Sequence, residues 1–468
     1  MFVNREAELE ILNNLYYRDG SVLFIVYGRR RTGKTTLLKK FIEDKTSSIY
    51  FLADTQLEQE NIKRFRAMAS VGLRDSAIDD LMPSWEAMFR YIASSAKRQE
   101  RKTIIVIDEF QYLAKSNPAV PSIFQRLWDE LLRESSVMLV LCGSLLGMMY
   151  KSTLSYESPL YGRRSGELLM KPMGFYSFRE FFKIGKFEKL LQIYSLTGGV
   201  PRYIEEVNEK LSVEENIYNN ILAKGSPFLN EPKFILSQEI EAPATYFSIL
   251  SSIAHGEHKV GGIAKRLEIK VQGLNKYLET LRELDLVARE VPITEKNPAK
   301  SKKGLYRIKD NFFRFWFRFV LPNMSHIELG NYEIVLENIR RDLGLFCSFV
   351  YEDVAREIVR NYIRTGVISK SFTSFGKWWS KDAEIDLVAM DMRSRNILVG
   401  ECKWTNQPVF YEEFKKLKSK TLLLQKALLV ENPKITYALF SKNGFSGDLI
   451  SKRSEELLLF DRDKLIEA

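Results

Sequence analysis

The sequence predicts a multidomain α/β protein, and three observations support this. In the first third of the chain, short apolar segments alternate with segments of helical periodicity, which is typical of a parallel sheet covered by helices. The middle of the chain is helical, and strand patterns return in the last third. With 468 residues, the chain is also too long for one ordinary hydrophobic core.

Five apolar segments are the expected strands of the first sheet, and they are residues 21–27, 47–53, 103–107, 137–142 and 168–170. A helix is expected directly after the first strand, at 36–43, and another before the fourth strand, at 124–133. From residue 176 to about 222 the pattern is helical.

The middle of the chain has the outline of a winged helix, in which three helices precede a two-stranded hairpin. The expected helices are 245–254, 262–267 and 271–284, and the expected strands are 286–293 and 305–308. The third helix would be the recognition helix. Its polar positions are Lys270, Gln272, Asn275, Lys276 and Arg282, and the loop of the hairpin carries Lys296, Lys300, Lys302 and Lys303.

An aromatic run, 311–319, follows the hairpin, and the last third begins with a helix at 345–360. The run could stack on nucleic-acid bases, but a buried helix is the preferred interpretation. Extended segments then surround 384–390 and 397–403. The predicted domains are an ATPase core at 1–172, a helical lid at 173–230, a winged helix at 231–310, aromatic connecting helices at 311–344 and a nuclease-like domain at 345–468.

The bulk composition limits the class of protein. No apolar run approaches the roughly 18 residues of a membrane helix, and acidic residues stand where a signal peptide would be apolar, so we expect a soluble, cytoplasmic protein without membrane contact. Cys142, Cys347 and Cys402 are far apart, which argues against disulfides and cysteine-bound zinc. The net charge of +10 fits a polyanionic partner and a solvated basic surface equally well.

The segment Gly28–Thr35 has the pattern G-x-x-x-x-G-K-T between a strand and a helix. Glycines let the backbone N–H groups surround phosphates, and the following helix N-terminus adds its dipole. Lys34 is expected to reach the β- and γ-phosphates of ATP, and the Thr35 hydroxyl to coordinate Mg²⁺. The residues expected to contact the nucleotide are Gly28, Arg29, Arg30, Arg31, Thr32, Gly33, Lys34, Thr35 and Thr36.

The third expected strand has the form of a Walker B strand, because its apolar residues 104–107 lead into Asp108 and Glu109. Asp108 would hold Mg²⁺, directly or through water, and Glu109 would polarise the attacking water. The next strand ends at Ser144, whose hydroxyl could sense the γ-phosphate.

Three arginines are candidates for contacts with phosphate charge, because a guanidinium suits phosphoryl transition states. Arg163 and Arg164 lie just before the fifth strand, where ring-forming ATPases place an arginine that reaches a neighbouring subunit. A solvated basic loop is the equal alternative. Arg202, in Gly-Gly-Val-Pro-Arg-Tyr, could sense nucleotide from the helical lid.

The sequence as a whole resembles the archaeal-type ATPase family of the AAA+/STAND branch. The resemblance rests on the opening at 2–9, the phosphate loop, the Gly-Gly-Val-Pro-Arg-Tyr segment and, in the rear half, motifs of the companion domain DUF234 such as Phe315-Trp-Phe-Arg-Phe319. It implies that Asn4 and Arg5 border the adenine and that the C-terminal domain has a nuclease-like fold.

In the last third, Asp386 lies in one apolar strand, and the next strand leads into Glu401-Cys402-Lys403. This is the arrangement of PD-(D/E)xK nucleases. Asp386 and Glu401 are expected to share Mg²⁺ or Mn²⁺ with the Cys402 carbonyl, and Lys403 to orient or deprotonate the attacking water. Glu357, or Glu352, could complete the site from the preceding helix. The alternative is a pair of exposed strand charges.

These patterns predict an ATP-driven enzyme that acts on DNA and carries a second, Mg²⁺-dependent nuclease site, with a homo-oligomer as one possible assembly. The alternative hypothesis is a STAND-like nucleotide switch whose rear domains dock partners without cleavage.

Overall fold

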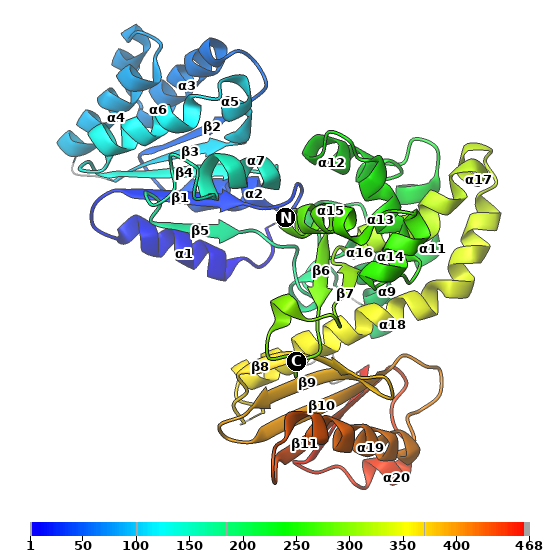
Figure 1. The fold of residues 1–468 in the computed structure, drawn as a ribbon. Helices are drawn as coiled ribbons and strands as arrows, with labels where there is room; N and C mark the ends of the chain where they lie inside the picture. The colour runs from blue at the N-terminus through cyan, green and yellow to red at the C-terminus, as the bar shows by residue number, and fades with distance from the viewer. Residues whose placement is uncertain (1, 100–101, 184, 369, 463–468) are drawn as a thin grey trace. The chain divides into compact units, whose positions relative to one another are not determined.

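The computed structural model describes residues 2–99, 102–183, 185–368 and 370–462 (Figure 1). The chain forms two compact units, and each is described by itself. The first unit contains Met1–Pro172, Val200–Arg202 and Ile235–Glu241. The second contains Met173–Gly199, Tyr203–Phe234 and Ala242–Ala468.

The first unit is built on a five-stranded sheet in the order β2-β3-β4-β1-β5, and every pair in it is parallel. This confirms the predicted parallel α/β fold. All residues of β3 and β4 are buried, as expected for continuous apolar runs covered on both faces. The strands are β1 Val22–Tyr27, β2 Ser48–Leu52, β3 Thr103–Asp108, β4 Val137–Gly143 and β5 Gly166–Leu169.

Helices cover both faces of this sheet. Leu12 of α1 and Leu37 of α2 pack in one core cluster, and Phe65 of α3 and Phe89 of α4 pack in the other. Helices α3 and α4 lie between β2 and β3, in a stretch for which the sequence patterns predict no helix bounds. The helices of this unit before residue 172 are α1 Glu6–Tyr17, α2 Lys34–Ile42, α3 Glu58–Leu73, α4 Trp85–Gln99, α5 Gln111–Ser116, α6 Val120–Leu127 and α7 Leu146–Met149, with a 3₁₀ turn Ser76–Asp80 and π-helical turns Trp128–Leu132 and Tyr150–Leu154.

Short helices follow the first sheet, as the helical pattern from residue 176 predicts. They are α8 Phe175–Arg179, α9 Phe187–Thr197, α10 Pro201–Glu205, α11 Val213–Ile217, the π-helical turn Tyr218–Leu222 and α12 Glu231–Glu239. A capping box between Ser212 and Glu215 begins α11, because each residue's side chain accepts the other's backbone N–H.

Three helices and an antiparallel hairpin come next, in the order that the sequence predicts. In α15, Leu274, Leu278 and Leu281 are buried, and most of the intervening polar residues are exposed, so the helix is amphipathic. The elements are α13 Ala244–Ala254, α14 Val260–Leu267, α15 Val271–Glu283, β6 Val287–Glu290 and β7 Leu305–Ile308, with a 3₁₀ turn Pro298–Lys300 in the hairpin loop.

The aromatic run is part of the core, which confirms the buried-helix interpretation over base stacking. Its six aromatic side chains between Phe312 and Phe319 are at most 3% exposed. Asp310 caps the first helix by accepting the N–H of Phe313 at 2.8 Å, and the indole of Trp316 donates to the Leu229 carbonyl at 2.7 Å. The elements are α16 Asn311–Phe315, a π-helical turn Trp316–Val320, a 3₁₀ turn Leu321–Asn323 and α17 Met324–Glu328.

One long helix, α18 (Tyr332–Arg364, 33 residues), leads into the last sheet. The predicted domain boundary at 344/345 therefore falls inside a helix. The sheet has the order β12-β11-β10-β9-β8, antiparallel from β8 to β10 and parallel from β10 to β12. Its elements are β8 Ser374–Trp379, β9 Glu384–Asp391, β10 Asn396–Lys403, α19 Tyr411–Leu428, β11 Lys434–Ser441, α20 Gly447–Ile450 and β12 Leu457–Phe460.

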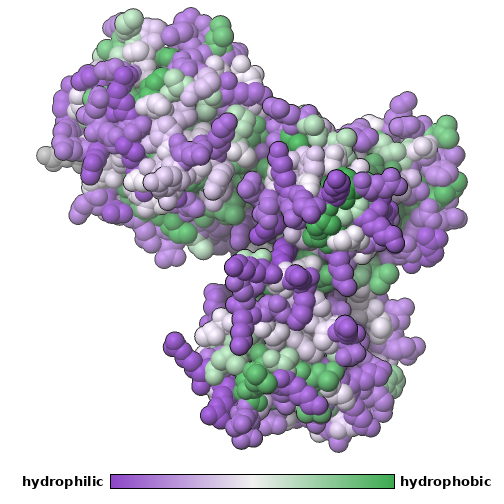
Figure 2. Space-filling model, viewed as in Figure 1, coloured by the Kyte–Doolittle hydropathy of each residue, from purple (hydrophilic) through white to green (hydrophobic). Residues whose placement is uncertain are grey.

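Two helices cover opposite faces of this sheet. Val354 and Ile358 of α18 pack with Leu387 and Leu398, and Leu417 of α19 belongs to a separate core cluster with other sheet residues. Hydrophilic residues cover most of the face drawn in Figure 2. None of the helices in the described part of the chain has the length and apolar character that a membrane span requires.

Because Phe313 is fully buried, Phe313→Ala should lower the free energy of unfolding by about 3–5 kcal/mol, through lost burial and the cavity left behind. Urea unfolding followed by tryptophan fluorescence measures this. Leu329→Ala is the control, because Leu329 is 75% exposed and its loss should change little. Equal stability of the two variants would contradict the core assignment.

Candidate nucleotide site and a second acidic cluster

Parallel pairing determines where the polar residues of the first unit meet. β1 pairs with β4, and β4 pairs with β3, so the carboxyl ends of these strands lie along one edge of the sheet. Gly28 follows β1, Asp108 ends β3 and Ser144 follows β4. Ligands of parallel α/β sheets bind outside this edge.

The phosphate loop has a backbone that only glycine tolerates at its first position. Gly28 has φ 156°, and a Cβ built there would lie 2.4 Å from the Met170 carbonyl oxygen. Gly33 has φ 91° and directly precedes α2. The loop can therefore curl closely against the end of β5 and present the start of α2 to a phosphate.

Lys34 is buried and directed at its own loop. Its ammonium donates to the carbonyls of Gly28 at 2.8 Å and Arg29 at 2.7 Å. Burial lowers the pKa of Lys34, and the nearby Cys142, Glu109 and Asp108 act in the opposite direction. The charge therefore lies at the loop, where phosphate oxygens would replace the carbonyl contacts.

Thr35 and Asp108 are brought together from α2 and β3. The Thr35 hydroxyl donates to Asp108 Oδ2 at 2.7 Å, and the Tyr50 hydroxyl of β2 donates to the same oxygen at 2.6 Å. Burial and the neighbouring Asp108 raise the pKa of Tyr50, so it remains a donor at neutral pH. Tyr50 was not predicted, because its position depends on the order of the strands.

Glu109 is held in a defined orientation one residue beyond β3. Its backbone is left-handed, with φ 57°, which is strained for a residue with a side chain. The Ser144 hydroxyl donates to Glu109 Oε2 at 2.7 Å, and the Gln111 amide donates to the same oxygen. The predicted base and the predicted sensor are thus in direct contact.

The turn after Ser144 has an anchor that sequence reasoning missed. Glu239 accepts the backbone N–H groups of Leu146 at 2.9 Å and Gly147 at 3.3 Å. Burial raises the pKa of Glu239, whereas the two backbone hydrogen bonds lower it. No sequence signal connects residues more than ninety positions apart, so only the fold reveals this contact.

Arg5 joins the N-terminus to the phosphate loop. Its guanidinium donates to the carbonyls of Thr32 at 3.3 Å and Lys171 at 2.8 Å, and it pairs with Glu8 at 2.6 Å. Asn4 Oδ1 accepts the N–H of Arg5 at 2.8 Å. Both residues therefore lie beside the loop.

The other residues predicted to contact the nucleotide lie in the loop or close to it. The Thr32 hydroxyl donates to the Arg29 carbonyl at 2.9 Å, and Arg30 donates to the Tyr112 hydroxyl. Arg31 has a left-handed backbone with φ 69°, and Thr36 is exposed in the first turn of α2. Arg202 is exposed and follows Pro201, whose Cγ would lie 3.8 Å from a Cβ at Gly33.

Arg163 and Arg164 are both ion-paired within the chain. Arg163 contacts Asp129 with an Nη2–Oδ2 distance of 2.9 Å, and Arg164 Nε lies 3.0 Å from Glu167 Oε2. A contact of either arginine with another subunit would require these pairs to open.

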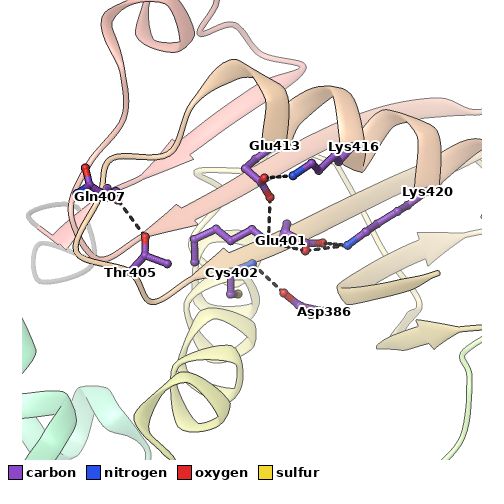
Figure 3. Close-up of polar contacts among 9 residues, drawn as sticks. Asp386, Glu401, Cys402, Thr405, Gln407, Glu413, Lys416 and Lys420 are labelled. Atoms are coloured by element: carbon purple, nitrogen blue, oxygen red, sulfur yellow. Dashed lines mark hydrogen bonds and ion pairs between the residues drawn. The ribbon is translucent and has the colours of Figure 1, made fainter. Parts of the chain in front are cut away.

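The second cluster lies where β9 begins beside the end of β10 (Figure 3). Gly400 pairs with Leu387, which makes Glu401 and Asp386 the next opposed residues of the antiparallel pair. Lys420 of α19 lies 2.8 Å and 2.9 Å from the two carboxylate oxygens of Glu401. Lys403 lies 3.1 Å from Glu401 and 3.0 Å from Glu413.

Asp386 is buried near two other carboxylates, those of Glu352 and Glu401, and near the ammonium group of Lys377. Its Oδ2 accepts the Cys402 N–H at 2.9 Å. Burial, followed by the charges of Glu352 and Glu401, raises the pKa of Asp386 to about 7. Although burial acts in the opposite direction, Glu401 and Glu413 raise the pKa of Lys403, so this lysine is held protonated and is suited to orient water rather than to deprotonate it.

Glu357 does not join this cluster, which corrects its assignment as a metal ligand. Both of its carboxylate oxygens accept backbone N–H groups at the start of α8, from Phe175 at 2.9 Å and Tyr176 at 3.2 Å. Glu352, the alternative on the same helix, is the residue whose charge raises the pKa of Asp386, and it pairs with Lys377. The two glutamates are five residues apart, so they occupy different faces of α18.

The two sites differ in how they fit a divalent cation. Thr35 and Asp108 offer a hydroxyl and a carboxylate oxygen, which suit Mg²⁺. At the second cluster, lysine ammonium groups occupy the oxygens of Glu401. In the part of the chain that the structure describes, no group of three or more His, Cys, Asp or Glu residues is placed to hold a metal.

Comparisons with known proteins match two parts of the chain to described families. Residues 2–207 match the family described as an ATPase domain predominantly from Archaea, and residues 316–419 match DUF234, a family of unknown function. The chain is 37% identical over 461 residues to the uncharacterized protein MJECL04 of Methanocaldococcus jannaschii, covering 98% of this chain and 99% of that protein.

Two further likenesses cover less of the chain. Over 45 residues the chain is 56% identical to the uncharacterized ATP-binding protein MJ0423 of the same organism, covering 10% of this chain and 76% of that protein. Among solved structures, the Walker-type ATPase of Pyrococcus abyssi has a TM-score of 0.50 at 22% identity, covering 68% of this chain and 96% of that chain. The likeness to the Pyrococcus abyssi structure shows the fold of this chain alone.

Because Glu239 accepts two backbone N–H groups after Ser144, Glu239→Ala should free them. We expect their hydrogen exchange to accelerate by about ten-fold or more, as befits the loss of charge-assisted hydrogen bonds. Exchange of the peptide containing Leu146 and Gly147 measures this. Glu241→Ala, at an exposed position two residues away, is the control, and equal exchange in both variants would contradict the anchoring role.

Proposed function

Because the chain belongs to the archaeal ATPase family, we propose that it binds ATP with Mg²⁺ and hydrolyses it, and that its second unit acts on DNA. One observation carries the proposal. At one edge of the first sheet, Thr35 contacts Asp108 while Ser144 contacts Glu109, each at 2.7 Å. The hydroxyl–carboxylate pair suits Mg²⁺, and the second carboxylate is oriented beside it as a base would be.

Different residues bind the phosphates, hold the cation and activate the water. Backbone N–H groups of the loop and the Lys34 ammonium bind the phosphates. Thr35 and Asp108 would hold Mg²⁺, which neutralises charge on the β- and γ-phosphates. Glu109 accepts a hydrogen bond from the attacking water and draws its proton, and Ser144 keeps that carboxylate aligned. Arg5 connects the loop, through the Thr32 carbonyl, to the chain after β5, through the Lys171 carbonyl.

Arg163 and Arg164 stay candidates for a contact with a neighbouring subunit's phosphate in a homo-oligomer. Their partners Asp129 and Glu167 are about one-third exposed, so the ion pairs are screened by solvent and cost little to open.

The three helices and hairpin of the second unit support a winged-helix role in DNA binding. Lys296, Lys300, Lys302 and Lys303 of the hairpin loop are exposed, as are Lys270 and Lys276 at α15. Lysines on a loop contact phosphates and give affinity without sequence choice. The alternative is a docking role toward proteins, as in a STAND-like switch.

Nuclease activity is the second candidate function, and the crowding of Asp386 favours it. Two carboxylates that face each other at one sheet edge repel unless a cation is near, and burial together with the charges of Glu352 and Glu401 raises the pKa of Asp386. Lys403, held protonated, would stabilise charge on a cleaved phosphate. Mg²⁺ or Mn²⁺ at Asp386 and Glu401 belongs to this proposal.

For hydrolysis, Glu109→Gln should bind ATP but turn it over at least about a hundred-fold more slowly, because an amide cannot accept the proton. Lys34→Ala should lose ATP binding. Phosphate release and nucleotide titration measure these effects, with Glu130→Gln as the control at an exposed acidic position. Normal turnover by Glu109→Gln would contradict the assignment of the base.

For DNA binding, replacing Lys300, Lys302 and Lys303 by alanine should reduce the slope of log affinity against log salt by up to about three, because each phosphate contact releases about one counterion. Replacement of the exposed Lys97, Lys115 and Lys151 removes the same charge from the first unit and is the control. If both triple variants keep the wild-type slope, the hairpin is not the DNA contact. The alternative, in which these helices and the hairpin dock proteins, is then favoured.

For cleavage, purified protein with Mg²⁺ or Mn²⁺ should cut DNA, and EDTA should stop it. Asp386→Ala and Lys403→Ala should each lose cleavage and keep ATP hydrolysis, because the two sites lie in different units. Asp382→Ala, at an exposed position before β9, should cut normally. Equal cleavage by wild type and Asp386→Ala would point to a contaminating nuclease or another site.

A further inference from the structure

A cavity of about 270 Å³ lies in the second unit, away from both sites described above. Its walls come from the end of α13, from β7, from the aromatic run and from the middle of α18. Phe319 and Phe346 are buried in the wall, whereas Leu345 and Phe349 are 62% and 39% exposed. The cavity therefore offers apolar surface that no other part of the described chain fully covers.

Three arginines also line this cavity, and the contacts with their acidic partners are 3.1–3.9 Å long, while Arg314 Nη2 also donates to the Ile308 carbonyl at 2.9 Å. Arg318 Nη2 lies 3.5 Å from Asp342, Arg314 Nη2 lies 3.9 Å from Asp353, and Arg307 Nε lies 3.1 Å from Glu290. Well-formed hydrogen bonds between guanidinium and carboxylate groups are about 2.7–2.9 Å long. The Arg307 Nε atom is buried and makes no hydrogen bond of good geometry.

Two of these carboxylates are shared with a further arginine. Arg341 contacts Asp342 at 3.1 Å, and Arg356 contacts Asp353. Asp342 and Asp353 are therefore each divided between two arginines, so neither is the exclusive partner of the arginine that lines the cavity. A buried charge without a full partner is costly, so an anion in the cavity would be stabilising.

The surroundings show the same positive potential. His258, which also lines the cavity, has its pKa lowered by burial and by the nearby Arg307 and Arg314. It is therefore neutral near pH 7, so the charged groups of the wall are the three arginines and Asp342.

We propose that this cavity binds a small organic anion, whose apolar or aromatic body lies against Phe346 and Phe349 and whose carboxylate or phosphate is held by the arginines. A guanidinium offers planar pairs of donors that match both anionic groups. The ligand is either a carboxylic acid with an apolar chain or a nucleoside monophosphate, since both combine an apolar face with one anionic end.

The test is displacement of the fluorescent probe 1-anilinonaphthalene-8-sulfonate from the full chain by decanoate, decanol and adenosine monophosphate. Lys34→Ala protein is used for the nucleotide arm, so that the first site does not contribute. Decanoate or the nucleotide should displace the probe at least about ten-fold better than the uncharged decanol, because decanol lacks the charge-assisted hydrogen bonds. Which of the two succeeds identifies the source of the anion.

Matched variants then locate the site. Arg318→Gln should weaken the successful anion by about ten-fold, because one guanidinium contact is lost. Arg341→Gln should not, because Arg341 shares Asp342 with Arg318 but does not line the cavity. Thermal unfolding of both variants checks that each is folded. Equal displacement by decanol and the anions, or equal affinity in the two variants, would overturn the proposal.

Discussion

The nucleotide site depends on one constraint, the parallel pairing of β1, β4 and β3. Parallel strands end at the same edge, and this brings together residues 28–35, 108–109 and 144, which are far apart in sequence. The side-chain contacts of the site depend on these strand ends lying side by side. Thr35 meets Asp108, and Glu109, whose backbone has a positive φ, has its carboxylate held by Ser144 and Gln111.

The sequence predicts this site because its parts are local patterns. A phosphate loop needs particular residues at fixed spacing, and a buried parallel strand is a continuous apolar run that ends where polar residues begin. Tyr50, Gln111 and Glu239 are different, because their roles depend on which strands and helices become neighbours. The same holds for Lys420, which reaches Glu401 from a helix that the sequence analysis had not delimited.

In the C-terminal sheet, local sequence patterns determine the position of some of the predicted residues and not of others. Asp386 and Glu401 do oppose each other, because the hairpin between two apolar strands fixes their register. The choice between Glu352 and Glu357 depends on the rotation of α18 against the sheet, which periodicity alone does not give. α18 also begins thirteen residues before the predicted helix, at Tyr332 and not at Leu345, because the helix continues without interruption across the predicted domain boundary.

The central claim is that Thr35 and Asp108 hold Mg²⁺ for bound ATP. Nucleotide affinity measured by calorimetry with Mg²⁺ and with EDTA, for wild type and Asp108→Asn, tests it most directly. The account predicts that Mg²⁺ strengthens binding to wild type and that Asp108→Asn loses most of this gain, because the amide is a weaker cation ligand. An identical Mg²⁺ effect in both proteins would contradict it.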